Sequence, residues 1–274
     1  MVGAKAASKN PRELANEFLP KLQELDFVEN VSVAGPGFIN IKIRDDFIFQ
    51  NATTPKPIKN ENPLVIDMDF GYGTINGRDG KPFKTRDGSA AGLDDILDMA
   101  NTAVQERVAE SNKHLDQETI KSIALAAVKF NDLVHDVRSD YIFDSNAITS
   151  FEGKTGPYIL YTAVRLNSVL KRADNNITKP DHFDLSPEER NLLIEIMDFD
   201  RTVLATCDNR VPDMIANYAY DLCQMVNTFY HNCPILRDDI DEKTRAGRIY
   251  IAKLAFDTLS TAIDLMGLTI PKEM

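Results

Sequence analysis

The sequence predicts a mainly α-helical protein, in which a C-terminal antiparallel helical bundle follows a small N-terminal α+β unit. From about residue 117 onward, apolar residues recur at helical spacing almost throughout, and the connections between these segments are short. Near the N-terminus, a Gly-Pro-Gly turn instead joins two short runs that are typical of strands. We therefore expect an α+β unit at 1–49, a linker region at 50–116 and a helical domain at 117–274.

The N-terminal unit combines one helix with a hairpin. Asn10 suits a helix N-cap and Pro11 suits the first helical position, so a helix begins here, with Pro20 as an interruption. Residues 31–33 and 38–43 are predicted as two strands. Because one helix and two strands bury little surface alone, we expect this unit to lean on another domain.

The region that follows has less regular patterning. Residues 50–63 are polar, contain three prolines and are typical of a linker. Residues 64–70 are predicted as a strand, and residues 71–88, with five glycines, as a loop or hairpin. A helix is predicted from Leu93 to about Val108.

The helical domain shows both its periodicity and its helix ends. Ser186-Pro187-Glu188-Glu189 is a capping box with proline in the first turn, and Gly267 is placed to end the last helix. The predicted helices span Ile120–Asp132, Gly156–Ala173, Arg190–Thr206, Val211–Tyr230 and Lys243–Leu265.

Composition indicates a globular protein of the cytoplasm. The 274 residues are 43% hydrophobic and 27% charged, and no apolar run approaches the roughly 20 residues of a membrane helix. The basic start lacks the apolar stretch of a signal peptide, and three cysteines without a CxxC pair are expected to be reduced. We expect no membrane and no DNA partner.

The charge is acidic, at −11, and residues 150–274 carry 14 Lys/Arg against 19 Asp/Glu. Because cationic contacts to phosphate dominate nucleic-acid affinity, charge alone favours a protein partner unless the basic residues gather on one face.

No catalytic or metal constellation is visible. The four histidines lack zinc-ligand spacing, no nucleophile–base pair stands out, and no glycine-rich dinucleotide turn is present. The acidic run at 238–242 is predicted to be a solvated loop. We expect no catalytic residues, no metal and no cofactor.

Several segments, in a fixed order, carry a family resemblance. They are Gly35–Ile43, Gly80–Arg86, Ala127–Leu133, Ser139–Asp144, Ser150–Tyr158, Asp221–Tyr230 and Gly267–Met274. Together they resemble class I arginyl-tRNA synthetases over most of the chain. In that family a large catalytic domain lies between the first two segments, so the resemblance implies a truncated or paralogous form lacking most of the catalytic Rossmann domain.

The resemblance implies that the helical domain, residues 117–274, is an anticodon-binding domain. Tyr158 and Arg165, seven residues apart, match residues lining the family's anticodon pocket, and Tyr230 and Met274 match its other walls. Aromatic faces and an arginine suit an extruded RNA base. The alternative is bundle core, which Tyr and Met at helical spacing more often form, and which we accept for Tyr161.

Two further sites follow from the resemblance. Phe38 and Asn40 match residues that read an exposed base of the tRNA D-loop, where a ring stacks and an amide bonds a base edge. The alternative is a core phenylalanine and a turn-capping asparagine. Lys81, Lys84 and Arg86 match the basic loop that lies over ATP in the complete enzyme.

The loop's partner motif is absent, because no two histidines have the His-Ile-Gly-His spacing. We therefore expect a remnant loop without ATP binding, ATP being a cofactor only where the family's catalytic site is complete. The leading hypothesis is an arginine-tRNA-binding protein that does not aminoacylate alone. The alternatives are an interaction module that binds a protein or a second copy through the face exposed by the missing domain, and an arginine–tRNA ligase that needs a catalytic part in trans.

Overall fold

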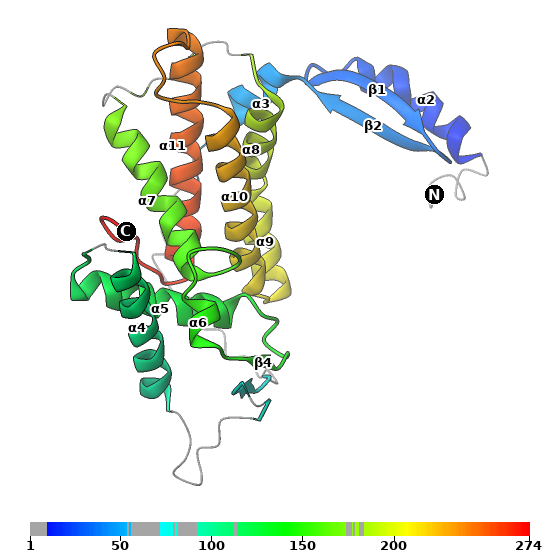
Figure 1. Ribbon diagram of the computed structural model, residues 1–274. Coiled ribbons are helices and arrows are strands. Elements are labelled where there is room, and N and C mark those ends of the chain that lie inside the picture. The colour runs from blue at the N-terminus through cyan, green and yellow to red at the C-terminus, as the bar shows by residue number, and fades with distance from the viewer. Residues whose placement is uncertain are drawn as a thin grey trace, which may run out of the picture.

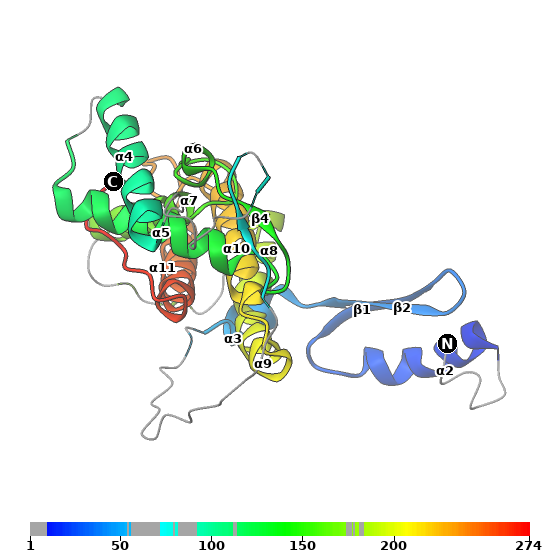
Figure 2. The same ribbon diagram turned by 90° about the horizontal axis from the view of Figure 1, so that it is seen from below.

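A computed structural model describes most of the chain. The described residues are 10–53, 55, 72–78, 80–81, 92–111, 114–173, 177, 179–180 and 184–274. A long helical bundle forms the body, and the N-terminal unit projects from one end of it (Figures 1 and 2). The fold is mainly α, as predicted from the helical periodicity.

The N-terminal unit is a helix packed on a two-stranded hairpin. Helix α2 (Pro11–Gln23) begins where predicted: the Asn10 side chain accepts a hydrogen bond from the Arg12 amide. Strands β1 (Val28–Ala34) and β2 (Phe38–Ile43) pair antiparallel. The turn between them requires glycine at Gly37, because φ is +127° and a Cβ would lie 2.7 Å from the Pro11 backbone.

A short helix, which the sequence did not predict, joins this unit to the bundle. Helix α3 (Asp45–Asn51) packs against α8 (Pro187–Met197), and its residues Ile48 and Phe49 enter the main core. Arg190 fixes the junction, since its Nε donates to Asp45 Oδ1 at 2.7 Å and its Nη2 donates to the Ile43 carbonyl at 2.7 Å. The expected linker thus begins later than residue 50, and the expected strand at 64–70 lies outside the described residues.

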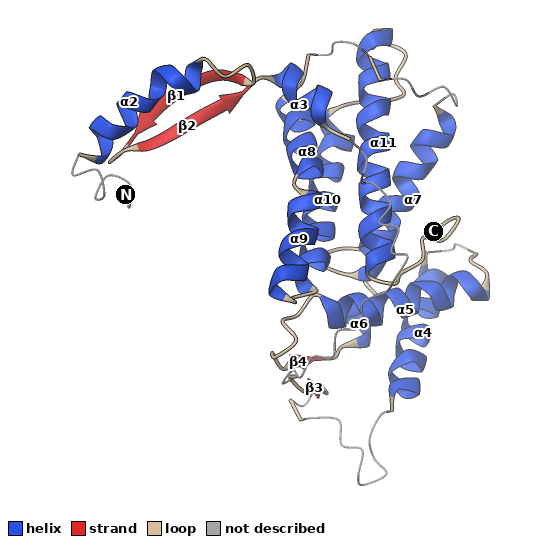
Figure 3. Ribbon diagram, turned by 180° about the vertical axis from the view of Figure 1, so that it is seen from behind, coloured by secondary structure: helices blue, strands red, loops and turns tan. Residues whose placement is uncertain are grey.

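At the opposite end of the bundle lies a two-stranded parallel ladder (Figure 3). Strand β3 (Ile75–Asn76) pairs with β4 (Tyr141–Ile142), two residues on each strand. Helix α4 (Leu93–Glu110) packs against α5 (Gln117–Leu133), and α6 (Ser145–Ile148) packs against both. The helix expected from Leu93 is therefore present.

The bundle encloses the main hydrophobic core. Its long helices run side by side in Figures 1 and 3, with α7 and α10 each contacting α11. Besides α8 its members are α7 (Gly156–Arg172), α9 (Phe199–Asn209), α10 (Asp213–Asn232) and α11 (Glu242–Leu265). Helix α5 lies across one end of these helices and contributes to the same core. Among the described helices, none is long and apolar enough to span a membrane.

One expected helix is in fact two. The pattern at Arg190–Thr206 predicted a single helix, but α8 ends and α9 begins at Asp198. The Asp198 backbone stays near helical values (φ −77°, ψ −8°), and its carboxylate accepts two hydrogen bonds from Arg201, at 2.5 and 2.6 Å. Because the Asp198 backbone stays near helical values and the local composition does not change, the sequence pattern did not show this one-residue interruption.

Candidate RNA-binding site

A cavity of about 570 Å³ opens between α4, α7, α10 and the C-terminal residue. Tyr158, Tyr161 and Arg165 follow one another at helical spacing on α7 and face it. Gln224, Asn227 and His231 do the same from α10. The remaining lining residues are Arg107, Val108, Ser111, Leu115, Phe151, Glu152 and Met274.

Asn227 connects two of the expected tRNA contacts. Its Nδ2 donates to the Tyr158 hydroxyl at 2.5 Å, and its Oδ1 accepts from Arg165 Nη1 at 3.0 Å. Gln224 Nε2 also donates to the Tyr158 hydroxyl, at 2.9 Å. The phenol and the guanidinium are thus held in one network on the cavity wall.

Arg165 lies between two aromatic rings. Its guanidinium carbon is 4.9 Å from the ring centroid of Tyr161 and 4.9 Å from that of Tyr230, within the range of cation–π attraction. Nη2 also donates to the Tyr161 hydroxyl at 3.1 Å. The interpretation of Tyr161 as a core residue was therefore wrong: its ring is half-buried and lines the cavity, because Arg165 one turn later holds it there.

The C-terminal segment brings Met274 to the cavity from a distance. Gly267, with φ +64°, follows α11 and turns the chain, and its carbonyl accepts from Lys129 Nζ at 2.7 Å. A Ser122 Oγ bond to the Thr269 carbonyl at 3.5 Å continues this contact along α5. The end of the chain therefore lies beside α4 and α5 in Figure 1.

The cavity is partly buried and carries cations on its wall. Burial raises the pKa of Tyr158 above its ordinary value, a shift that the hydrogen bond from Asn227 opposes, so the hydroxyl stays protonated near neutral pH. Arg107 is anchored, because its Nη2 donates to the Asn146 carbonyl at 2.5 Å and its Nε donates to Thr149 Oγ1 at 3.3 Å. Glu152 is the acid in the lining.

Phe38 and Asn40 lie on the uncovered face of the hairpin. The register pairs Ala34 with Phe38 and Ser32 with Asn40, so these four side chains share one face. The opposite face presents the apolar pairs Val31–Ile41 and Val33–Ile39. Phe38 is 63% exposed and Asn40 is also exposed, so neither is a core residue, and both are free to meet a ligand.

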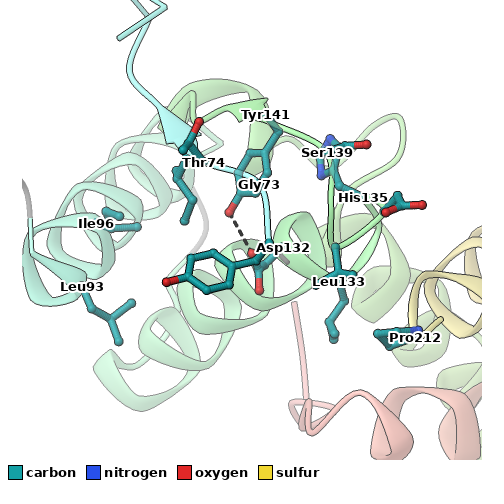
Figure 4. Close-up of a pocket in the computed structure, with 14 residues that line it drawn as sticks. Gly73, Thr74, Leu93, Ile96, Asp132, Leu133, His135, Ser139, Tyr141 and Pro212 are labelled. Carbon is teal, nitrogen blue, oxygen red and sulfur yellow. Dashed lines mark hydrogen bonds between the residues drawn. The ribbon is translucent and has the colours of Figure 1, made fainter. Parts of the chain in front are cut away.

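A second cavity, of about 580 Å³, lies at the end of the bundle beside β3 and β4 (Figure 4). Within it the Tyr141 hydroxyl donates to Asp132 Oδ1 at 3.0 Å. Burial, with the charge and hydrogen bond of Asp132, raises the pKa of the phenol. The His135 ring stacks on Tyr141 with centroids 4.7 Å apart. His135 Nδ1 is 2.6 Å from the Asn131 carbonyl oxygen, so these groups are engaged with one another and do not form a free acid–base pair.

Of the three basic residues expected in the ATP loop, the structure describes Lys81. Lys81 is exposed and lines neither cavity, and its carbonyl accepts from the Gly77 amide at 2.9 Å. Lys84 and Arg86 lie outside the described residues. Within the described ranges, no group of His, Cys, Asp or Glu side chains is placed to hold a metal ion.

Sequence reasoning assigned no role to Gln224 or Asn227, although both line the cavity. A signal was present: in the predicted helix at 211–230 they are polar positions three apart on one helical face. Arg107 and Phe151 reach the same cavity from other segments, which periodicity could not show.

Comparison with protein families assigns this architecture to a class of enzymes. The family model described as the DALR anticodon binding domain matches residues 159–274, and that for the catalytic domain of class I (R) tRNA synthetases matches residues 54–145. A helical DALR bundle behind part of a class I catalytic domain is the architecture of an aminoacyl-tRNA synthetase. The model for the arginyl tRNA synthetase N terminal domain matches residues 1–43.

Curated relatives agree with these matches. An arginine–tRNA ligase of Alkaliphilus oremlandii is 39% identical over 216 residues, which are 75% of this chain and 36% of the relative. One from Francisella tularensis subsp. novicida is 37% identical over 211 residues, 74% of this chain and 36% of the relative. The Thermus thermophilus arginyl-tRNA synthetase structure matches with a TM-score of 0.67 and 30% identity, over 74% of this chain and 35% of that one.

The chain belongs to the arginyl-tRNA synthetase family. It spans about a third of the length of the curated relatives that it matches.

Proposed function

We propose that this chain is an arginine-tRNA-binding protein that holds the anticodon stem-loop in the cavity between α7 and α10 and does not aminoacylate alone. The observation that carries the proposal is the convergence on one cavity of Tyr158 and Arg165 from α7, Asn227 from α10 and Met274 from the C-terminal segment. Tyr230 adds a 37% exposed ring beside Arg165. An extruded base requires such a set, with rings to stack on and fixed donors for its edge.

Titration by fluorescence anisotropy tests the proposal directly. Arginine tRNA transcripts should bind more tightly than an unrelated tRNA at the same ionic strength. Replacing Tyr158 by Leu removes a stacking face and should weaken binding by about 1–3 kcal/mol. Exposed Lys171, near the end of α7, provides a control: K171Q should leave the arginine tRNA preference intact. Equal affinity for arginine tRNA and the unrelated tRNA would contradict the proposal.

The hairpin face is proposed as a second contact with the same tRNA. Phe38 and Asn40 are exposed on one face, and the adjacent Lys42 is held by Glu29 at 2.6 Å. F38A should weaken binding of a full tRNA while leaving binding of an isolated anticodon stem-loop unchanged. If F38A weakened binding of both RNAs equally, Phe38 would not be a contact to the part of the tRNA outside the anticodon stem-loop.

The chain is proposed to lack autonomous ligase activity. The matched part of the catalytic domain model covers residues 54–145, and the basic loop position Lys81 faces neither cavity. We therefore expect no pyrophosphate exchange with arginine and ATP by the isolated protein. Turnover above background would show that this segment suffices for amino-acid activation.

A second candidate function is docking of a catalytic polypeptide. Around the second cavity Tyr72 is 84% exposed and Leu93 67% exposed. Among the described residues β3 and β4 form a sheet of two parallel strands, whereas parallel sheets are normally larger and covered. These residues fall within the match to the catalytic domain. Light scattering, alone and with a separately expressed catalytic domain, tests this function: a complex that survives RNase supports it, and a monomer in both samples opposes it.

A further inference from the structure

Beside the cavity lies a cation–aromatic pair that does not line it. Lys154 Nζ is 5.5 Å from the ring centroid of Tyr220. The Tyr220 ring lies 5.9 Å from that of Tyr158, the cavity residue, at an angle of 51°. Lys154 is exposed and Tyr220 half-buried, so a ligand that fills the cavity can continue onto them.

We propose that Lys154 and Tyr220 form a second nucleotide subsite, which takes the RNA nucleotide next to the one bound in the cavity. This inference rests on the proposed function and names a binding determinant beyond it. The ligand class is an unpaired RNA segment of at least two nucleotides: Tyr220 stacks on one base, and Lys154 contacts the phosphate that joins it to the next.

The local structure holds this pair in place. Lys154 donates one hydrogen bond to Asn217 Oδ1 on α10, the helix that carries Tyr220. Lys154 lies within a loop that Thr155 closes, because its Oγ1 donates to the Ser150 carbonyl at 2.6 Å. An ammonium has three N–H donors, so two remain for a phosphate after the Asn217 bond.

The subsite continues a row of contacts between α7 and α10. From Tyr220 the row passes to Tyr158, then through Asn227 to Arg165 and Tyr230. With Lys154 at its start, the row contains three aromatic rings and two cations, the kinds of group that bind single-stranded RNA. Asn217, which accepts from Lys154, in turn donates to the Asp213 carbonyl at 2.7 Å and to Asp213 Oδ2 at 3.4 Å.

The Lys154–Tyr220 contact itself does not block a base. At 5.5 Å the ammonium lies near the outer limit of cation–π attraction, which at exposed sites amounts to about two- to fivefold in affinity. Stacking of a base contributes about 5- to 150-fold, so an incoming base displaces the ammonium toward the phosphate.

The test measures binding of an arginine-tRNA anticodon stem-loop by anisotropy over a series of salt concentrations. Y220L should weaken binding by about 5- to 150-fold, whereas Y220F, which keeps the ring, should bind as the unaltered chain does. K154Q should make the slope of log affinity against log salt shallower by about 0.7, the value for one phosphate contact on a single strand. K171Q, at the other end of α7, should leave the slope unchanged.

The outcomes separate this inference from the proposed function. If Y158L weakens binding while Y220L and K154Q bind like the unaltered chain, the second subsite is absent and the cavity proposal stands. An unaltered slope for K154Q, or equal losses for Y220F and Y220L, would also overturn the subsite. If the unaltered chain shows no preference for arginine tRNA, the proposed function fails, and the subsite fails with it.

Discussion

Glu189 shows how one side chain can join three parts of the bundle. It is only 1% exposed, and its Oε2 accepts from the Ser186 amide at 2.7 Å, which completes the capping box predicted from the sequence. Its Oε1 accepts from Arg248 Nε of α11 at 2.7 Å. Arg248 Nη1 in turn donates to the Pro234 carbonyl at 2.8 Å. The cap was readable from local sequence, but the partner 59 residues away was not.

Breaking this buried pair should be costly. R248M leaves the Glu189 carboxylate buried without its counter-charge, so we expect the free energy of unfolding to fall by about 3–5 kcal/mol. The double variant E189Q with R248M removes that stranded charge and should be more stable than R248M alone. Urea unfolding of both variants measures the difference. A double variant less stable than R248M would contradict this account.

Glu195 gives a pH-dependent prediction at the residue scale. Burial, with Asp221 and Asp198 nearby, raises the pKa of its carboxyl. Because the folded state holds this proton more tightly than the unfolded state, stability is highest below the unfolded pKa and is lost as pH rises through the raised folded pKa. E195Q does not titrate, so its stability relative to the unaltered chain should increase from about pH 4 upward and then level off. Urea unfolding across this range checks it, and a constant difference would refute it.

At the scale of elements, the sequence predicted what local periodicity controls. Helices α5, α7, α10 and α11 lie within a few residues of their expected ranges, because apolar stripes and caps define them. The parallel pairing of β3 with β4 could not be predicted, since it joins segments 66 residues apart through two residues on each side. Nor could α3, a seven-residue helix that tertiary packing stabilises.

Helix α7 approaches α5 closely at Gly156, and this gives a prediction for the element. A Cβ there would lie 2.2 Å from the Ala126 carbonyl oxygen, a backbone atom that cannot step aside without moving α5. We expect G156A to lower the free energy of unfolding by about 3 kcal/mol or more.

Gly153 provides the matched control for that variant. Its φ is +80° but a Cβ would meet nothing within 4 Å, so G153A should cost only the strain of the left-handed region, about 1–2 kcal/mol. Thermal or urea unfolding of the pair separates close packing from backbone strain. If G153A were the more destabilising change, the close approach of α5 and α7 would not be what constrains Gly156.

At the scale of the whole molecule, helical spacing within one segment predicted only part of the candidate site. Tyr158 and Arg165 were expected on one face because they are seven residues apart, and both line the cavity. Asn227 and Met274 reach the same cavity from α10 and from the segment after Gly267. Their approach depends on how helices pack and where the chain turns back, which the sequence of one element does not encode.

The overall charge of −11 leads to a prediction about the whole molecule. A strongly acidic protein repels RNA in general, so we expect binding to depend on the few cations in and beside the cavity, chiefly Arg165 and Lys154. About 0.7 for each phosphate contact gives a slope of log affinity against log salt between about −1.4 and −3 for the anticodon stem-loop. A plain RNA duplex of equal length, which offers no unpaired base, should bind far more weakly at every salt concentration. Anisotropy titrations of both RNAs test this, and a slope of about −6, or equal binding of the duplex, would mean that a basic surface elsewhere on the chain holds the RNA.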